Sequence, residues 1–203
     1  MSTPRSFAIV PAAGRSERMG RPKLLLPWRG ATVIEHVLSA WKRAGVSRVV
    51  VVVHPEDQAL AAVCRDAGVD VVVADPPPAD MKASVQCGLA HVASHYAPSA
   101  SDAWLLAPAD MPLLEPGWIE TLLSSRRPAP DEIIVASCQG RRGHPVLFAW
   151  PLAREAAELM PDEGLNVLLD RHPCSRVELP SEVLGDLDTP DDYQRLPHRD
   201  GRP

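Results

Sequence analysis

The chain has 203 residues, of which 45% are apolar, and a formal net charge of −5. A chain of this length can bury a full core, so we predict one domain over residues 1–203, with frayed ends at about 1–5 and 198–203. The negative charge argues against a nucleic acid as partner, because binding a phosphate backbone requires a basic surface. It leaves room for a small anionic ligand in a local basic pocket.

The sequence shows no sign of a membrane or secretory destination. No apolar stretch is long enough to span a bilayer, and the first residues lack the apolar core of a signal peptide. The four cysteines are scattered without a CxxC pair, which is typical of reduced thiols. We therefore predict a cytoplasmic protein without a membrane partner.

Apolar runs and amphipathic segments alternate along the chain. The apolar runs cover residues 7–10, 48–53, 70–74, 103–107, 132–137 and 146–149, with a further strand near 177–179. Their continuous apolar character is typical of strands that are covered on both faces. Helical spacing is found after residue 32 and over residues 55–67, 81–92 and 118–123. This alternation predicts an α/β fold, a Rossmann-like three-layer α/β/α sandwich with a mostly parallel sheet.

Two of the predicted helices carry terminal signals. Thr32 and Glu35 have the S/T-x-x-E spacing of a capping box, which predicts that a helix begins directly after Thr32. Gly45 stands where that helix would end, and Gly68 has the same position behind the helix predicted over residues 55–67.

The segment directly after the first strand, residues 11–23, is the most informative part of the chain. It combines small residues and glycines with three cations, Arg15, Arg18 and Lys23. Small side chains allow a phosphate to approach the backbone N–H groups closely, and the cations offset its charge. The segment contains neither a Walker A loop nor the GxGxxG pattern of dinucleotide-binding proteins. We therefore predict a polyphosphate-binding loop of another type.

Two carboxylates that follow later strands are candidates for a metal site. Ligands of open α/β sheets bind beyond the carboxyl ends of the strands, where residues 11–23 also lie. Asp110 lies in a Pro-x-Asp-x-Pro turn after one strand, and Asp188 follows another. A nucleoside triphosphate carries about four negative charges, so a divalent cation with oxygen ligands usually shares its binding. We predict Mg²⁺ held by Asp110 and Asp188, with Asp186 as a weaker candidate.

Each of these features also has a simpler interpretation. An aspartate after a strand is commonly a turn former, and Asp188 or Asp191 could cap a helix that begins near Pro190. The cations of residues 11–23 could form a solvated loop face. The ligand site is favoured because the basic loop and the acidic residues all follow strands and meet at one predicted rim.

Five stretches of the chain, taken together and in order, match the motifs of one known family. They are Ala12-Ala13-Gly14-x-Ser16-x-Arg18-Met19-Gly20-x-Pro22-Lys23, Met81-Lys82-Ala83-Ser84-Val85, Ala109-Asp110-Met111-Pro112, Gly143-His144-Pro145-Val146 and Asp186-Leu187-Asp188-Thr189-Pro190. With these motifs, nearly the whole chain resembles the molybdenum-cofactor cytidylyltransferase-like (MobA-like NTP transferase) family of nucleotidyltransferases.

The resemblance implies roles for the matched residues at the nucleotide. The implied nucleotide-binding residues are Ala12, Ala13, Gly14, Arg18, Lys23 and Ser84. Backbone amides of the first three would hold the base and the phosphates. Arg18 and Lys23 would neutralise the triphosphate, and Ser84 would contact the nucleoside. The Ala-Ala-Gly version of the loop is the one that favours CTP.

The resemblance also implies a metal site and an acceptor side. Asp110 and Asp188 would hold Mg²⁺, and the implied catalytic residues are Arg18, Lys23 and Asp110. Gly143, His144 and Pro145 would face the acceptor, with packing in the core as an equal alternative for His144. Residues 162–169 lack the arginine that many members carry here, which removes an expected anion contact.

The implied activity is the Mg²⁺-dependent transfer of a CMP or other NMP group from a nucleoside triphosphate to a phosphorylated acceptor, with release of pyrophosphate. Molybdopterin is the favoured acceptor. A sugar phosphate or another phosphorylated metabolite is the nearest alternative. A non-catalytic nucleotide-binding module is the alternative from a different class, and it would not need the pair of Asp110 and Asp188.

Overall fold

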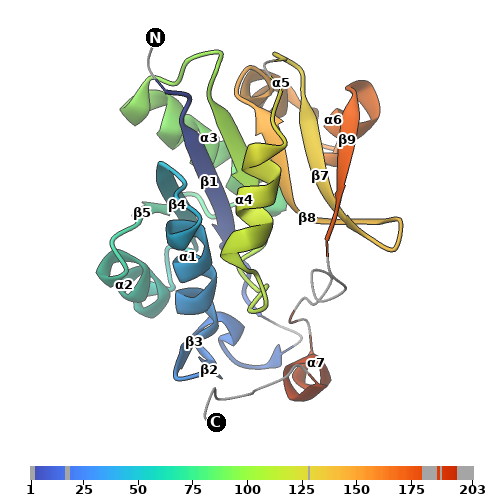
Figure 1. The fold of residues 1–203 in the computed structure, drawn as a ribbon. Coiled ribbons are helices and arrows are strands. Elements are labelled where there is room, and N and C mark those ends of the chain that lie inside the picture. The colour runs from blue at the N-terminus through green and yellow to red at the C-terminus, as the bar shows by residue number, and fades with distance from the viewer. Residues whose placement is uncertain (1–2, 17–18, 128, 180–186, 188, 196–203) are drawn as a thin grey trace.

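The computed structural model describes residues 3–16, 19–127, 129–179, 187 and 189–195, and its fold is shown in Figure 1. In these ranges seven strands form one sheet in the order β5-β4-β1-β6-β8-β7-β9. They are β1 Ser6–Ala12, β4 Arg48–Val53, β5 Asp70–Val73, β6 Ala103–Leu106, β7 Ile133–Cys138, β8 Arg141–Ala149 and β9 Cys174–Glu178. Neighbouring strands are parallel except at β8, which is antiparallel to β6 and β7. The predicted mostly parallel sheet is confirmed.

Helices cover both faces of this sheet (Figure 1). They are α1 Val33–Arg43, α2 Gln58–Asp66, α3 Met81–Tyr96, α4 Pro116–Ser124, α5 Leu152–Glu158 and α6 Asn166–Arg171. A further helix, α7 Pro190–Arg195, lies outside these two layers. Helices α1, α2 and α4 pack with Ala8 and Val10 of β1, whereas α3, α5 and α6 pack on the face that carries Phe7 and Ile9. Successive side chains of a strand point to opposite faces, so β1 contributes to both cores. The three-layer prediction is therefore confirmed.

The ends of the first two helices follow from local hydrogen bonds. Glu35 N donates to Thr32 Oγ1 at 3.4 Å and Thr32 N donates to Glu35 Oε2 at 2.7 Å, which is the predicted capping box. Gly45 has a φ of 72°, as the residue that ends a helix commonly requires. Helix α2 begins three residues later than predicted because Asp57 accepts from Leu60 N at 3.1 Å and caps it there.

Strand β8 is longer than the predicted strand over residues 146–149. It begins at Arg141 because a two-residue turn joins it to β7, with φ angles of 50° at Gln139 and 77° at Gly140. Positive φ at both positions suits the twist of a tight hairpin. Residues 143–145 therefore lie within a strand, beside the end of β6.

Helix α3 approaches β1 closely. A Cβ added at Gly88 would lie 2.8 Å from Ile9 Cγ2, closer than real side chains pack. Glycine is required there because a larger residue would push the helix away from the sheet. The position of α3 against the central strand is thus set by its middle turn.

Helix α7 packs against a small hairpin of β2 (Pro27–Trp28) and β3 (Ala31–Thr32). Tyr193 Oη donates to the carbonyl oxygen of Pro27 at 2.5 Å, and its ring lies 6.3 Å from the ring of Trp28. The helix predicted near Pro190 is confirmed. Within the part of the chain described by the structure, no helix has both the length and the apolar character needed to cross a bilayer.

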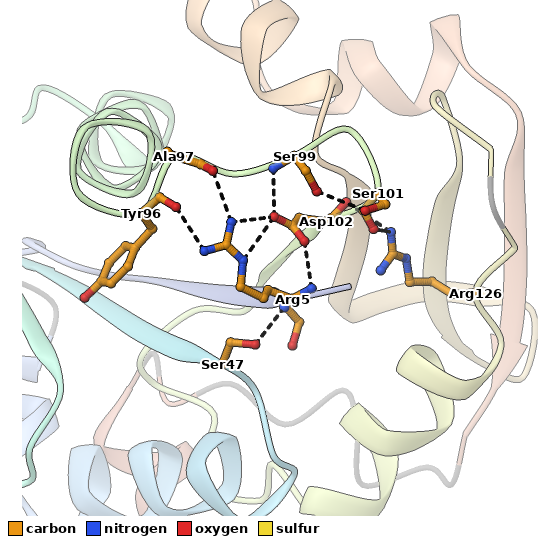
Figure 2. A network of polar contacts seen from close by, with 9 residues as sticks. Arg5, Ser47, Tyr96, Ala97, Ser99, Ser101, Asp102 and Arg126 are labelled. Carbon is orange, nitrogen blue, oxygen red and sulfur yellow. Dashed lines mark hydrogen bonds and ion pairs between the residues drawn. The ribbon is translucent and has the colours of Figure 1, made fainter. Parts of the chain in front are cut away.

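Asp102 lies at the centre of a polar network at the amino ends of β1 and β6 (Figure 2). Its carboxylate accepts from the backbone N–H of Arg5 at 2.7 Å, from Arg5 Nη2 at 2.9 Å and from Ser99 N at 2.8 Å. Burial alone would raise the pKa of Asp102, but these hydrogen bonds hold it below its ordinary value. Arg126 donates to the carbonyls of Ser101 and Asp102, so the network joins β1, β6 and the end of α4.

We expect Asp102→Asn to lower the free energy of unfolding at pH 7 by about 2 kcal/mol. The N–H donors of Arg5 and Ser99 would then contact a neutral amide instead of a charged carboxylate. The pKa of Asp102 is lower in the folded chain, so the carboxylate stabilises the fold above the unfolded value of about 3.9. This contribution is lost as the pH falls through the folded pKa. Urea unfolding at pH 7 and pH 3 should show a gap between wild type and variant that shrinks at pH 3. An equal gap at both pH values would contradict the argument.

Candidate active site

A cleft of about 680 Å³ opens beyond the carboxyl ends of the central strands. Its walls are the loop after β1, the loop that leads into α3 and the turn after β6. The lining residues are 11–16, 77–81 and 108–110, with Met19, Lys23, Leu24, His54 and Ser84. The predicted site residues that meet here are Ala12, Ala13, Gly14, Lys23, Ser84 and Asp110. This is the edge at which open α/β sheets bind their ligands.

The loop after β1 turns back on itself before it reaches Lys23. Ser16 has a φ of 53° and Gly20 a φ of 62°, and Met19 N donates to the carbonyl oxygen of Ser16 at 3.0 Å. Lys23 N donates to Ser16 Oγ at 3.3 Å. These contacts return Lys23 to the cleft although it lies eleven positions after Ala12. Arg18, the other predicted cation, lies outside the described residues.

Lys23 and Asp110 form an ion pair in the cleft. Their side chains are 17% and 15% exposed, so solvent screens the pair only weakly. Lys23 Nζ also donates to the carbonyl oxygen of Leu187 at 2.8 Å. The backbone N–H of Leu187 donates to the carbonyl oxygen of Asp110 at 3.0 Å. Leu187 itself is fully buried, so a residue near the C-terminus joins the β1 loop and the turn after β6.

The second oxygen of Asp110 fits a metal ligand. Asp110 Oδ1 is buried and has no hydrogen-bond partner among the described residues. Such an atom costs free energy unless a donor or a cation reaches it, and Mg²⁺ prefers carboxylate oxygens. Over the described ranges, no group of three or more His, Cys, Asp or Glu side chains could hold a metal ion. Asp188 and Asp186 lie outside these ranges, so the pairing of Asp110 with Asp188 stays a prediction.

The first turn of α3 presents Ser84 to the cleft. Asp80 caps the helix by accepting from Ala83 N at 2.7 Å. Ser84 is 3% exposed, and its hydroxyl donates to the carbonyl oxygen of Asp80 at 3.2 Å. The hydroxyl oxygen keeps acceptor capacity toward the cleft. A contact between Ser84 and a nucleoside stays a prediction.

His54 lines the cleft and was missed by the sequence reasoning. It directly follows β4 and is 8% exposed, with Nδ1 accepting from Glu56 N at 3.1 Å. Arg15 Nη2 lies 3.2 Å from His54 Nε2 and 3.0 Å from Glu56 Oε2, so this cation is engaged by the β4–α2 loop. The strand-end rule that singled out Asp110 would also have found His54.

His144, Gly143 and Pro145 are not among the lining residues of the cleft. They lie on β8, and His144 Nδ1 is 3.3 Å from the carbonyl oxygen of Leu106 at the end of β6. Burial lowers the pKa of His144, against the opposing effects of that hydrogen bond and the charge of Asp110. Burial thus favours the neutral form of the imidazole. Its role toward an acceptor stays a prediction.

Comparison with known families decides the classification. The family model described as "MobA-like NTP transferase domain" matches residues 8–177. The chain belongs to this family. Relatives in this family are named guanylyl- and cytidylyltransferases, and the chain is an enzyme of the nucleotidyltransferase type.

Named relatives align over most of their length. Molybdenum cofactor guanylyltransferase of Xanthomonas euvesicatoria is 28% identical over 199 residues, covering 94% of this chain and 93% of the relative. Molybdenum cofactor cytidylyltransferase of Escherichia coli is 26% identical over 188 residues, covering 91% and 92%. Nicotine blue oxidoreductase of Paenarthrobacter nicotinovorans is 30% identical over 200 residues, covering 93% and 94%.

A solved structure of similar length also superposes on the chain. The crystal structure of Rv0371c from Mycobacterium tuberculosis has a TM-score of 0.81 and 32% identity, covering 96% of this chain and 98% of that one. The same mycobacterial protein has been solved in complex with manganese, with a TM-score of 0.73. The α/β nucleotidyltransferase fold is therefore shared with solved structures.

Proposed function

We propose that the protein transfers a CMP group from CTP to a phosphorylated small-molecule acceptor and releases pyrophosphate, with Mg²⁺ as the metal. The observation that carries the proposal is the meeting of Lys23 and Asp110 under the glycine loop of β1. A cation, a carboxylate and the small residues 12–14 in one cleft suit a metal–triphosphate. Simple nucleotide binding would not need the pair of Asp110 and Asp188 that is proposed to hold the metal.

The residues of the cleft would act mainly by positioning and by offsetting charge. Backbone N–H groups of Ala12, Ala13 and Gly14 would hold the phosphates, and the ammonium of Lys23 would offset charge that builds on the leaving pyrophosphate. The acceptor phosphate is already ionised, so it attacks the α-phosphorus without a protein nucleophile. Mg²⁺ bound at Asp110 Oδ1 would supply further charge neutralisation to the transferred group.

The choice of CTP rests on the Ala12-Ala13-Gly14 version of the loop, and relatives carry both cytidylyl- and guanylyltransferase names. GTP is therefore the alternative donor. Molybdopterin is the favoured acceptor because both of these relatives are named for the molybdenum cofactor. A sugar phosphate or another phosphorylated metabolite is the nearest alternative acceptor.

We expect pyrophosphate release when CTP and Mg²⁺ are offered with molybdopterin, and little release with CTP alone. GTP, ATP and a panel of sugar phosphates give the comparison, and each donor is tested with each acceptor. Removal of the metal with EDTA should abolish release, and added Mg²⁺ should restore it. The product should carry CMP on the acceptor phosphate, as mass spectrometry would show.

The other outcomes separate the alternatives. Release of pyrophosphate with a sugar phosphate but not with molybdopterin would change the proposed acceptor and leave the proposed reaction unchanged. Tight binding of a nucleotide without release from any pair would support a non-catalytic module. One relative is named an oxidoreductase, so oxidation of NADH and NADPH is measured in parallel. Activity there without pyrophosphate release would overturn the proposed transfer.

A further inference from the structure

Lys82 in the first turn of α3 is buried and fully engaged by one loop. Lys82 is only 8% exposed to solvent. The ammonium donates to the carbonyl oxygens of Met160 at 2.6 Å, Glu163 at 2.8 Å and Pro161 at 2.9 Å. Three donors meet three acceptors, so the hydrogen-bonding capacity of the group is used completely. Lys82 therefore ties α3 to residues 160–163, the loop between α5 and α6.

This loop is closed by hydrogen bonds of its own. Glu163 N donates to the carbonyl oxygen of Met160 at 3.0 Å, and Met160 N donates back to Glu163 Oε2 at 2.9 Å. Arg171 of α6 donates to Glu163 Oε1 at 2.5 Å. The loop is thus a closed turn that is braced from α6. Lys82 is therefore attached to a loop that is itself hydrogen-bonded to α6.

Lys82 and Ser84 lie on opposite sides of the helix. Two residues along an α-helix are separated by about 200°. Met81 and Ser84 line the cleft, whereas Lys82 points to the α5 side. Gln86 lies one turn further on that side and donates to the carbonyl oxygen of Ala156 at 3.0 Å. The turn that forms one wall of the cleft is therefore held from behind by two polar contacts.

If stability were the only requirement, a lysine at position 82 would be an unfavourable choice. Lys82 falls on the same stripe as Val85, Leu89 and Val92, which are all buried. Burying an ammonium carries a desolvation penalty, and a well-packed apolar residue is often at least as stabilising. A lysine on this stripe is better explained by a requirement for a defined position of the helix end.

We propose that Lys82 is a positioning residue for the nucleotide, acting through Ser84 and the first turn of α3. This inference rests on the proposed function of the cleft. The three carbonyl contacts fix the distance between the first turn and the loop at residues 160–163. They thereby fix where Ser84 and the N-terminal end of α3 meet the nucleoside.

The test is equilibrium binding of nucleoside triphosphates by calorimetry in the presence of Mg²⁺, followed by kinetics. CTP, GTP, ATP and UTP are titrated into the wild type, and the tightest one is used throughout. Lys82→Met keeps an unbranched side chain that is one atom shorter and removes its three donors. We expect nucleotide binding to weaken about tenfold. Displacing this wall of the cleft should cost roughly as much binding free energy as the loss of one polar contact. We expect the KM for that nucleotide to rise in proportion, while the KM for the acceptor stays unchanged.

The matched control is Lys42→Met. Lys42 also donates to a main-chain carbonyl, that of Ala67, at 2.7 Å, but it lies at the end of α1 away from the cleft. It should leave nucleotide binding unchanged. Lys82→Arg keeps donors at the position and should recover part of the lost affinity. If Lys82→Met does not fold, Gln86→Leu takes its place. It removes the hydrogen bond from Gln86 to Ala156 and involves no buried charge. It should also weaken nucleotide binding, by a smaller factor.

A double-variant cycle tests whether Lys82 acts through Ser84. If it does, Lys82→Met should cost much less affinity in the Ser84→Ala background than in the wild type. Full additivity would overturn the assignment, and so would unchanged nucleotide binding in Lys82→Met with a lowered melting temperature. The readout is binding, so it remains informative even if no acceptor reacts. Wild-type protein that binds none of the four nucleotides would instead overturn the proposed function.

Discussion

Asp110→Asn should lower kcat/KM for the donor nucleotide by at least about 10³-fold while the fold remains intact. The amide keeps the shape of the carboxylate but removes the charge that pairs with Lys23 and the oxygen proposed to hold Mg²⁺. Steady-state pyrophosphate release over a range of Mg²⁺ concentrations measures the loss. Circular dichroism should show an unchanged spectrum, because the strand and turn that carry Asp110 are held by backbone contacts.

Asp102→Asn is the matched control for this variant. The change is the same, and Asp102 is more deeply buried than Asp110, with side chains that are 2% and 15% exposed. Asp102 lies at the opposite ends of β1 and β6 (Figure 2). We expect it to lose stability and to keep its turnover at 25 °C, the reverse of Asp110→Asn. Near-normal activity of Asp110→Asn would show that the metal assignment is wrong. Equal loss of activity in both variants would indicate a general effect on folding.

Lys23→Met should raise the KM for the nucleoside triphosphate and lower kcat, with a combined loss of about 10²-fold or more in kcat/KM. The ammonium of Lys23 connects the β1 loop to the carboxylate of Asp110 and to the carbonyl oxygen of Leu187. It would contact the phosphates both in the bound substrate and as the pyrophosphate leaves, so both constants should change. Initial rates at varied nucleotide and fixed acceptor separate the two effects.

Lys23→Arg keeps the positive charge and distinguishes charge from shape. We expect it to recover a part of the KM effect, since an arginine can also contact phosphate but with a different geometry. An unchanged kinetic profile in Lys23→Met would remove this residue from the site. Such a result would leave Asp110 without the cation on which the proposed arrangement depends.

The meeting of Lys23 and Asp110 could be predicted because it follows from topology. Both residues come after strands that the apolar runs identify, and parallel strands place their carboxyl ends at one edge. The same rule identifies His54, which was overlooked because a lone histidine carries no motif. Arg18 and Asp188 follow from the same reasoning, and their placement stays a prediction.

Other parts of the fold carried too little sequence signal. Helices α5 and α6 have seven and six residues, fewer than the two turns over which helical periodicity becomes visible. Strand β8 was predicted too short because Gln139-Gly140 is not among the usual turn pairs for a tight hairpin. Lys82 did leave a signal, since a charged residue stands at the first position of the stripe that Val85, Leu89 and Val92 continue. Its partners at residues 160–163 are visible only in three dimensions.

The backbone contacts of Leu187 have a practical consequence for dissecting this enzyme. The family match stops at residue 177. The carbonyl oxygen that accepts a hydrogen bond from Lys23 belongs to residue 187. A protein shortened to the matched region would lose that acceptor together with the N–H that reaches Asp110. The contacts that hold Lys23 and Asp110 thus extend ten residues past the end of the family match, and a protein cut at residue 177 would lack part of the proposed site.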